Sequence, residues 1–372
     1  MCHESVAFPM SATEEEQDEL SRGPAEEGTE PASSESINDA IVEIREIPGT
    51  EGFYNAAAWE SNGTTYLLGR RVEVAGEEGQ PDVGSLVLLA LGPDGNIVSS
   101  KEVWRPKAGE NLLEDARALP LPDGRIAFGL TSLDDRYTPH PSVLIASIEE
   151  LVEGTLPKPK VIRVLGKGGQ TTPLGENVGD SEGKNVTAFG PDLLFAFRPE
   201  GNNHQLQVFR YHETGEATYR QSIDLPDDIP SLEYKVGTTM PPVWLNENKA
   251  ILLLHGIKIV DGKFVYSITS SRLLKDEEGI LSVDNVSRKP IIDPDIFAGM
   301  FGGQEVELHG ERRVVYCCGG IPIYDNNGKL EYLKLYVNVG DKRTVEVTVS
   351  AAKLTEGWQI SEPLEHEMSL AA

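Results

Sequence analysis

Residues 112–130 read LLEDARALPLPDGRIAFGL, and this stretch contains the pattern that the rest of the chain repeats. Apolar residues flank the polar tetrad Glu114-Asp115-Ala116-Arg117, a Pro-Asp-Gly turn follows at 122–124, and a second apolar run begins at Ile126. Pro, Asp and Gly between two short apolar runs indicate a β-hairpin rather than a helix. The stretch therefore predicts two antiparallel strands, with a polar cluster near the start of the first.

Paired strand-like runs of this kind recur five times along the chain. The pairs are 66–68 with 86–91, 125–130 with 142–146, 193–197 with 205–209, 250–254 with 264–268, and 313–318 with 332–337. Turn signals lie between or beside them at 92–96, 122–124, 260–263 and 325–328. The alternating segment 40–44 predicts an additional first strand, and only 147–152 has a helical pattern. The chain is therefore expected to be all-β, as a five-bladed β-propeller, with a β-sandwich as the alternative.

The first part of the chain differs in composition from everything after it. Residues 1–45 combine acidic clusters such as Glu14-Glu15-Glu16 with Ser, Gly and Pro and contain few large apolar side chains. Such a segment cannot bury enough apolar surface to fold, so we expect a disordered acidic tail. Residues 46–360 would then form the propeller, as a catalytic domain, and 361–372 a C-terminal tail.

Composition also limits the classes of partner. The formal net charge of −27 repels phosphate backbones and anionic lipid surfaces, so neither nucleic acid nor a membrane is expected as a partner. The chain starts without a signal-peptide pattern, and no apolar run reaches the roughly 18 residues of a membrane span. These features predict a cytoplasmic protein.

Neither a disulfide framework nor a metal site is predicted. The chain has three cysteines, of which Cys317-Cys318 lie within an apolar run and are expected to pack in a sheet. The seven histidines show no zinc-ligand spacing and no cysteine partners at such spacing. No metal and no cofactor are therefore expected.

Short polar clusters stand at the ends of the apolar runs in every predicted blade. In a propeller the innermost strands line a central channel, so residues at one end of these strands converge from all blades. The clusters are Tyr54-Asn55 and Gly69-Arg70, then Glu114-Asp115-Ala116-Arg117, then Lys184-Asn185 and Phe197-Arg198-Pro199, then Met240-Pro241-Pro242 and Leu254-His255-Gly256, and finally Tyr316-Cys317-Cys318 and Asn338-Val339-Gly340-Asp341. We expect these clusters to form one site.

The ordered set of motifs resembles that of glycoside hydrolase family 130, the five-bladed propeller phosphorylases and glycosidases that act on β-mannosides. Members carry an Asn in an opening strand, an Arg at a strand end, Glu-Asp-Pro-Arg, a Lys-Asp or Lys-Asn pair, an Arg-Pro strand end, a Pro-Pro before Tyr-His-Gly, and a late Tyr-Tyr-Gly-Ala-Ala-Asp. The same order holds here from about residue 50 to about residue 345.

Four positions depart from the family's pattern. Ala116 follows Asp115 where the family has proline, and Gly69 replaces a tyrosine before Arg70. Phe189-Gly190 replaces Phe-Pro, and Asn338-Val339 interrupts the Tyr-Gly-Ala-Ala run. The charged residues of the motifs are all retained.

The resemblance implies a role for each motif residue. Asp115 would be the catalytic acid, acting through a sugar hydroxyl, and inorganic phosphate would be the co-substrate beside an oligosaccharide or mannoside. Phosphate would be bound by Arg70, Lys184, Arg198 and His255, and the sugar by Asn55, Arg70, Glu114, Arg117, Asn185 and Asp341. Four basic groups directed at one channel would reverse the local field of an acidic chain, which favours phosphorolysis over hydrolysis.

Three hypotheses follow from these residues. The first is an inverting phosphorylase that converts β-linked mannosides to α-mannose 1-phosphate. The second is an inverting hydrolase, which needs a second carboxylate to activate water, supplied by Glu305, Glu307 or Asp341. The third is a propeller that binds a glycan or another protein without chemistry, because the motif substitutions have dismantled the active site. Taken singly, Asp115 with Arg117 could also be a structural ion pair, and His255 a hydrogen-bonded core histidine. The sequence leaves the oligomeric state open.

Overall fold

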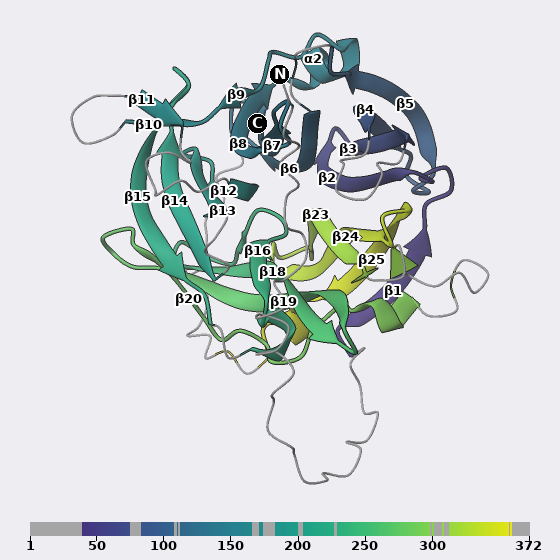
Figure 1. Cartoon of the computed structure of the whole chain (residues 1–372). Coiled ribbons are helices and arrows are strands. Elements are labelled where there is room, and N and C mark those ends of the chain that lie inside the picture. The colour runs from purple at the N-terminus through teal and green to yellow at the C-terminus, as the bar shows by residue number, and fades with distance from the viewer. Residues whose placement is uncertain are drawn as a thin grey trace, which may run out of the picture.

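The computed structural model describes residues 39–74, 83–107, 110, 112–165, 171–173, 183–199, 204–226, 229–297, 300, 307–308, 312–356 and 358. Within these residues the chain forms five sheets arranged as blades around a central axis (Figure 1). The chain is therefore a five-bladed β-propeller, as the repeated strand pairs predicted, and the β-sandwich alternative is wrong.

Blades one, two and three are each built from strands that follow one another in sequence. Blade one contains β2 (Phe53–Ser61), β3 (Thr64–Val74), β4 (Val83–Leu91) and β5 (Ile97–Trp104). Blade two contains β6 (Leu112–Pro120), β7 (Ile126–Leu133), β8 (Pro139–Ala146) and β9 (Lys160–Val161). Blade three contains β12 (Gly183–Gly190), β13 (Leu194–Pro199), β14 (Gln205–Tyr211) and β15 (Glu216–Asp224), with β10 (Arg163–Leu165) and β11 (Thr171–Pro173) at its outer edge.

The remaining blades include the longest strands and the closure of the ring. Blade four contains β16 (Lys235–Thr238), β17 (Val243–Trp244), β18 (Lys249–Val260), β19 (Lys263–Lys275), β20 (Leu281–Asp284), β21 (Glu307–Leu308) and β22 (Arg312–Arg313). Blade five contains β23 (Val315–Tyr324), β24 (Leu330–Val339), β25 (Arg343–Ser350) and, from the other end of the chain, β1 (Ile41–Glu46). Pairing of β1 with β25 joins the two ends of the propeller, so the ring is closed by backbone hydrogen bonds.

Most predicted strands coincide with observed ones. Counted outward from the inner strand of each sheet, the predicted pairs are the second and third strands in blades one to four, and the first and second in blade five. The segment 40–44 corresponds to β1, so the propeller begins at Ile41, inside the segment that we expected to be tail. The acidic residues before it, the disorder expected for them, and residues 361–372 lie outside the described residues.

Turn and helix chemistry also agrees with the sequence. Gly95, Gly124 and Gly328 take positive φ angles of 71°, 84° and 77° in the predicted turns, which glycine tolerates because it has no Cβ. Helix α2 (Ile148–Glu153) starts at a capping box formed by Ser147 and Glu150. The other helical segments in the described chain are α4 (Ala351–Leu354) and the 3₁₀ turns η1 (Pro230–Leu232) and η2 (Pro294–Phe297). No helix in this part of the chain is long and apolar enough to cross a bilayer.

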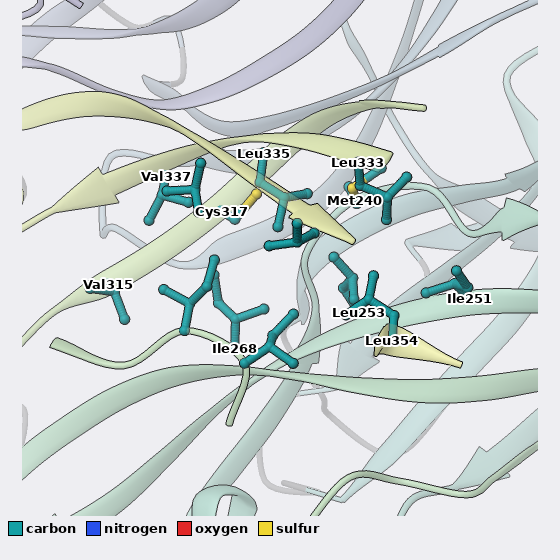
Figure 2. Packing of buried hydrophobic residues seen from close by; sticks show 14 of the residues in the cluster. Met240, Ile251, Leu253, Ile268, Val315, Cys317, Leu333, Leu335, Val337 and Leu354 are labelled. Carbon is teal, nitrogen blue, oxygen red and sulfur yellow. The ribbon is translucent and has the colours of Figure 1, made fainter. Parts of the chain in front are cut away.

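The hydrophobic core lies between the blades. Between blades four and five, Ile251, Leu253 and Ile268 face Cys317 and Leu335 in the cluster that Figure 2 shows. Cys317 and Cys318 are both buried and free, as the sequence suggested. Interfaces of this kind fix each blade relative to the next, and with them the positions of the inner strands.

Candidate active site

The inner strands of blades one, two and three carry the same irregularity at the same place. In each, one extra residue enters the pairing with the second strand, between Tyr54 and Ala57 in β2, between Glu114 and Arg117 in β6, and between Lys184 and Thr187 in β12. This is a β-bulge, which bends the strand and redirects a side chain. The three bulges therefore place equivalent residues at equivalent points around the channel.

The bulged residue is an Asn or Asp with left-handed backbone geometry in each case. Asn55, Asp115 and Asn185 have φ angles of 54°, 56° and 62°. Asn and Asp are the non-glycine residues that tolerate this conformation best. Three members of the predicted site thus occupy one repeated position, which explains why the sequence shows a polar residue there in three successive blades.

The strand next to each inner strand contributes a second set of side chains. Arg70 lies opposite Tyr54, Arg198 opposite Lys184, His255 opposite Gly237, and Asn338 opposite Tyr316. Because these positions correspond from blade to blade, two arginines, a histidine and an asparagine enter the same end of the channel. The cationic residues predicted from the sequence are therefore not on unrelated outer surfaces.

Asp115 is the central carboxyl group of this end of the channel. Its residue is 9% exposed, and its Oδ1 accepts a hydrogen bond of 2.8 Å from Nδ2 of Asn55. Burial raises the pKa of Asp115, and the neighbouring charge of Glu114 raises it further, while Arg117, Lys184 and Arg70 act in the opposite direction. A carboxyl group with a raised pKa can keep a proton near neutral pH, as a general acid must.

Glu114 forms ion pairs with two of the cationic residues predicted from the sequence. Its Oε2 lies 2.8 Å from Nη1 of Arg70, and its Oε1 lies 3.2 Å from Nζ of Lys184. These three residues come from blades one, two and three and stand beside Asp115. Arg198, which is 4% exposed, is the cross-strand neighbour of Lys184. Arg70 and Lys184 therefore contact Glu114 directly, and Arg198 lies next to Lys184 on the neighbouring strand.

Arg117 connects four blades beneath Asp115. The residue is fully buried, and its guanidinium donates to the carbonyl oxygens of Thr239 and Asp115, each at 2.8 Å. It also donates to Oδ1 of Asn185 at 3.0 Å and to the hydroxyl of Tyr316 at 2.7 Å. A planar donor group with fixed geometry holds several partners at once, so Arg117 fixes the relative positions of the inner strands.

His255 closes this cluster on the side of blade four. It is 3% exposed, its Nε2 lies 3.4 Å from Nδ2 of Asn185, and its ring meets that of Tyr316 edge to face at 4.6 Å. Burial lowers the pKa of His255 well below its usual value, and the charges of Arg198 and Arg117 lower it further. His255 is therefore neutral at pH 7 and can act toward an anion as a hydrogen-bonding group, not as a charge.

Asp341 reaches the same cluster through two amides. Nδ2 of Asn338 donates to Oδ1 of Asp341 and, at 3.2 Å, to Oδ1 of Asn55, whose own Nδ2 contacts Asp115. Asp341 follows β24 with a φ angle of 49°. Of the other carboxylates considered as a general base, Glu307 belongs to β21 of blade four, and Glu305 lies outside the described residues.

The structure shows what surrounds Ala116 and Gly69, two of the positions that depart from the family pattern. Ala116 is fully buried in the cluster that contains Trp59 and Phe128, while Asp115 before it keeps its bulged geometry. A Cβ at Gly69 would lie 2.6 Å from the ring of Phe53, so the aromatic side chain of the neighbouring strand fills the space above Gly69. Neither substitution removes a charged group from the channel.

Three residues near the site were not predicted as site residues. Tyr316 and Asn338 stood in quoted motifs, but only their cross-strand pairing in blade five directs both toward Asp115 and Asn55. Tyr266 of β19 has a raised pKa through burial, and the charges of Arg312, Asp341 and Arg198 also act on it. Its position opposite Ile257 in the β18–β19 hairpin could not be inferred without the strand register. No cluster of metal-binding side chains occurs among the described residues.

Comparison with known proteins finds similar solved structures but no match in sequence. No family model matches the chain, and no curated protein matches it in sequence. A β-1,2-mannobiose phosphorylase from Listeria innocua, solved with β-1,2-mannobiose, superposes with a TM-score of 0.60 at 14% identity, over 85% of this chain and 97% of that one. A glycosyl hydrolase from Bacteroides ovatus gives a TM-score of 0.57 at 14% identity, over 87% and 93%.

A third structure comes from the GH130 family of mannoside phosphorylases, which contains glycoside hydrolases that target β-1,2-mannosidic linkages in Candida mannan. It gives a TM-score of 0.57 at 12% identity and covers 88% of this chain and 98% of that one. At such identities the likeness establishes the fold, which is the propeller that the sequence resemblance implied.

Proposed function

We propose that this chain is a carbohydrate-active enzyme, an inverting phosphorylase that cleaves β-linked mannosides with inorganic phosphate and releases α-mannose 1-phosphate. The observation that carries the proposal is the pairing, at one end of the channel, of a buried carboxyl group, Asp115, with cationic side chains from blades one and three. An acid and an anion pocket are the two requirements of phosphorolysis.

Asp115 is the proton donor in this proposal. In phosphorolysis an oxygen of phosphate bonds to the anomeric carbon as the bond from that carbon to the leaving oxygen breaks, and the leaving oxygen takes a proton. Asp115, with a pKa raised by burial and by Glu114, supplies this proton, directly or through a sugar hydroxyl. Asn55, Asn185 and Asp341 surround it as hydrogen-bonding partners for the sugar.

The phosphate is bound in this proposal by Arg70, Lys184 and Arg198. Phosphate entering beside Glu114 would find the two cations that Glu114 already orients, and Arg198 next to Lys184. His255 lies behind these cations, with its Nε2 facing Nδ2 of Asn185. Cationic groups held in fixed positions bind the dianion without reorganisation at the moment of reaction. The similar structures that act on β-1,2-mannosides support a mannoside as the substrate class.

Turnover with and without phosphate tests this function. Short β-mannosides, with β-1,2-mannobiose first, are incubated with the full-length protein, and sugar phosphates are followed by ³¹P NMR. We expect α-mannose 1-phosphate to form only when phosphate is present, and Asp115→Asn to abolish it. Release of free mannose at the same rate without phosphate would reject phosphorolysis.

A hydrolase is the second candidate, because Asp341 is joined to Asp115 through Asn338 and Asn55 and so belongs to the same site. An inverting hydrolase needs such a second carboxylate as general base. Asp341→Asn separates the two functions. A phosphorylase would lose affinity for the sugar, seen as a raised KM, whereas a hydrolase would lose kcat.

A further inference from the structure

Asn338 and Tyr316 are cross-strand neighbours in blade five, and each is connected to a different oxygen of Asp115. Tyr316 does so directly, with its hydroxyl 3.5 Å from Oδ2. Asn338 does so through Asn55, which donates to Oδ1. The two oxygens of the carboxyl group therefore have different surroundings.

The orientation of Asn338 is set by Asp341. An ionised carboxylate accepts hydrogen bonds and donates none, so the amide group of Asn338 must present its NH₂ to Asp341. The same NH₂ donates its second hydrogen to Oδ1 of Asn55. Oδ1 of Asn338 is buried and accepts no hydrogen bond from the described residues, so the side chain contributes to this cluster as a donor alone.

The orientation of Asn55 follows from that of Asn338. Because Oδ1 of Asn55 accepts from Asn338, its Nδ2 has to face Asp115, and it donates to Oδ1 of Asp115 at 2.8 Å. While Oδ1 of Asp115 accepts this hydrogen bond, a proton on Oδ1 cannot point toward Nδ2 of Asn55. A proton on Asp115 is thereby excluded from the Oδ1 side that faces Asn55.

Because Oδ1 already accepts from an amide, it is the less favourable oxygen for the proton, which favours Oδ2, and Tyr316 leaves Oδ2 available. A phenol has a single hydrogen, and the hydroxyl of Tyr316 lies 2.6 Å from Oδ1 of Asn185 but 3.5 Å from Oδ2 of Asp115. The hydrogen therefore belongs to the shorter contact. Oδ2 of Asp115 is then the oxygen that can hold a transferable proton.

We propose that Asn338 is a positioning residue that sets the amide of Asn55 through Asp341 and so assigns the proton of Asp115 to Oδ2. This inference rests on the proposed function only for its catalytic consequence. Without Asn338 the amide of Asn55 can turn, and the proton can occupy either oxygen.

The direct test follows the side-chain amide of Asn55 by NMR in full-length protein labelled with ¹⁵N asparagine, with the signal assigned from its loss in Asn55→Ser. In the wild type this signal should titrate with Asp115. In Asn338→Ala, loss of the fixed donor should move the midpoint to higher pH, because a hydrogen bond to the carboxylate favours the ionised form. An unchanged midpoint would overturn the proposal.

Two further variants make the test specific. Asn338→Leu keeps a side chain branched at Cγ without a donor and leaves no cavity, so it should behave as Asn338→Ala does, which separates the lost hydrogen bonds from a cavity. Thr344→Val is the matched control, because Thr344 pairs with Asn338 across β24 and β25, is equally buried, and donates to the carbonyl of Phe53 instead. It should leave the Asn55 titration as in the wild type, and a shift as large as that of Asn338→Ala would overturn the assignment.

Turnover provides the second measurement. Asn338→Ala should lower kcat by about tenfold or more with a smaller change in KM, because a misplaced acid costs rate more than binding. The alkaline limb of its pH profile should move upward with the NMR midpoint. If no glycoside is turned over by any form, the proposed function fails, while the titration of Asn55 still decides the role of Asn338.

Discussion

Arg117 and Tyr316 are 199 positions apart in sequence, yet a hydrogen bond of 2.7 Å joins the guanidinium of one to the hydroxyl of the other. Both side chains are buried, and both also contact Asn185 of a third blade. The bond exists only because the ring of blades is closed, with blade five brought back beside blades one and two. The candidate site therefore depends on the whole propeller.

Replacing Arg117 should destabilise the protein strongly. Arg117→Met leaves the carbonyl oxygens of Thr239 and Asp115 without their donor, and loss of a buried, hydrogen-bonded charge costs about 3 kcal/mol or more. The free energy of unfolding in urea measures the loss. Arg105→Met, which breaks an exposed ion pair with Glu73 and Glu102, is the control and should change stability by about 1 kcal/mol or less. Equal effects of the two substitutions would contradict the role given to Arg117.

His255 should make the protein less stable in acid. Its pKa is lowered in the folded state, so the unfolded chain binds the proton more tightly, and stability is lost as the pH falls below the ordinary histidine value of about 6.5. The expected slope approaches about 1.4 kcal/mol per pH unit for this one group. His255→Gln should flatten the curve of unfolding free energy between neutral and acidic pH.

The matched control for this pH dependence is His212→Gln, because His212 is exposed and its Nε2 contacts the hydroxyl of Thr218. Its curve should run parallel to that of the wild type. Parallel curves for His255→Gln and the wild type would show that the pKa of His255 does not change on folding, which would contradict the effect of burial on this residue.

The adjacent cysteines should be inert while the protein is folded. Burial raises the pKa of Cys317 to about 12, and burial also raises the pKa of Cys318 well above its usual value. The thiolate is the reactive form, so iodoacetamide at mildly alkaline pH should not modify either residue. Peptide mass spectrometry before and after unfolding in urea measures this. Rapid labelling of the folded protein at Cys317 or Cys318 would show that this part of blade five opens.

Much of the architecture could be predicted from the chain, because it depends on local signals. Turn residues such as Asp123-Gly124 and Asp325 with Gly328 marked hairpins that the structure contains, and the apolar runs marked strands of all five blades. The polar residues Asn55, Asp115 and Asn185 were identified as candidates because they stand in polar clusters at the ends of apolar runs and match the motifs of the family that the chain resembles. Their common left-handed geometry was not visible in the sequence, since a bulge depends on pairing with the next strand.

The contributions of blade five were the hardest to predict. Simple alternation along a strand gives no reason for Tyr316 and Asn338 to face one site, because their pairing depends on the register of β23 with β24 and on a further bulge near Cys317. Closure by β1 placed this blade beside blade one, which brought Asn338 to Asn55. Long-range register is set by packing and not by local propensity, so single-residue roles there could not be inferred.

Soaking phosphate into a crystal of the protein is the sharpest test of the phosphate site. The ion should lie in the channel, in contact with Arg198 and with the Arg70 and Lys184 groups that border Glu114, within one sugar ring of Asp115. Binding should be lost in Arg198→Met. Phosphate found only on the outer surface, with the channel side chains unchanged around Glu114, would contradict the assignment of this site to phosphorolysis.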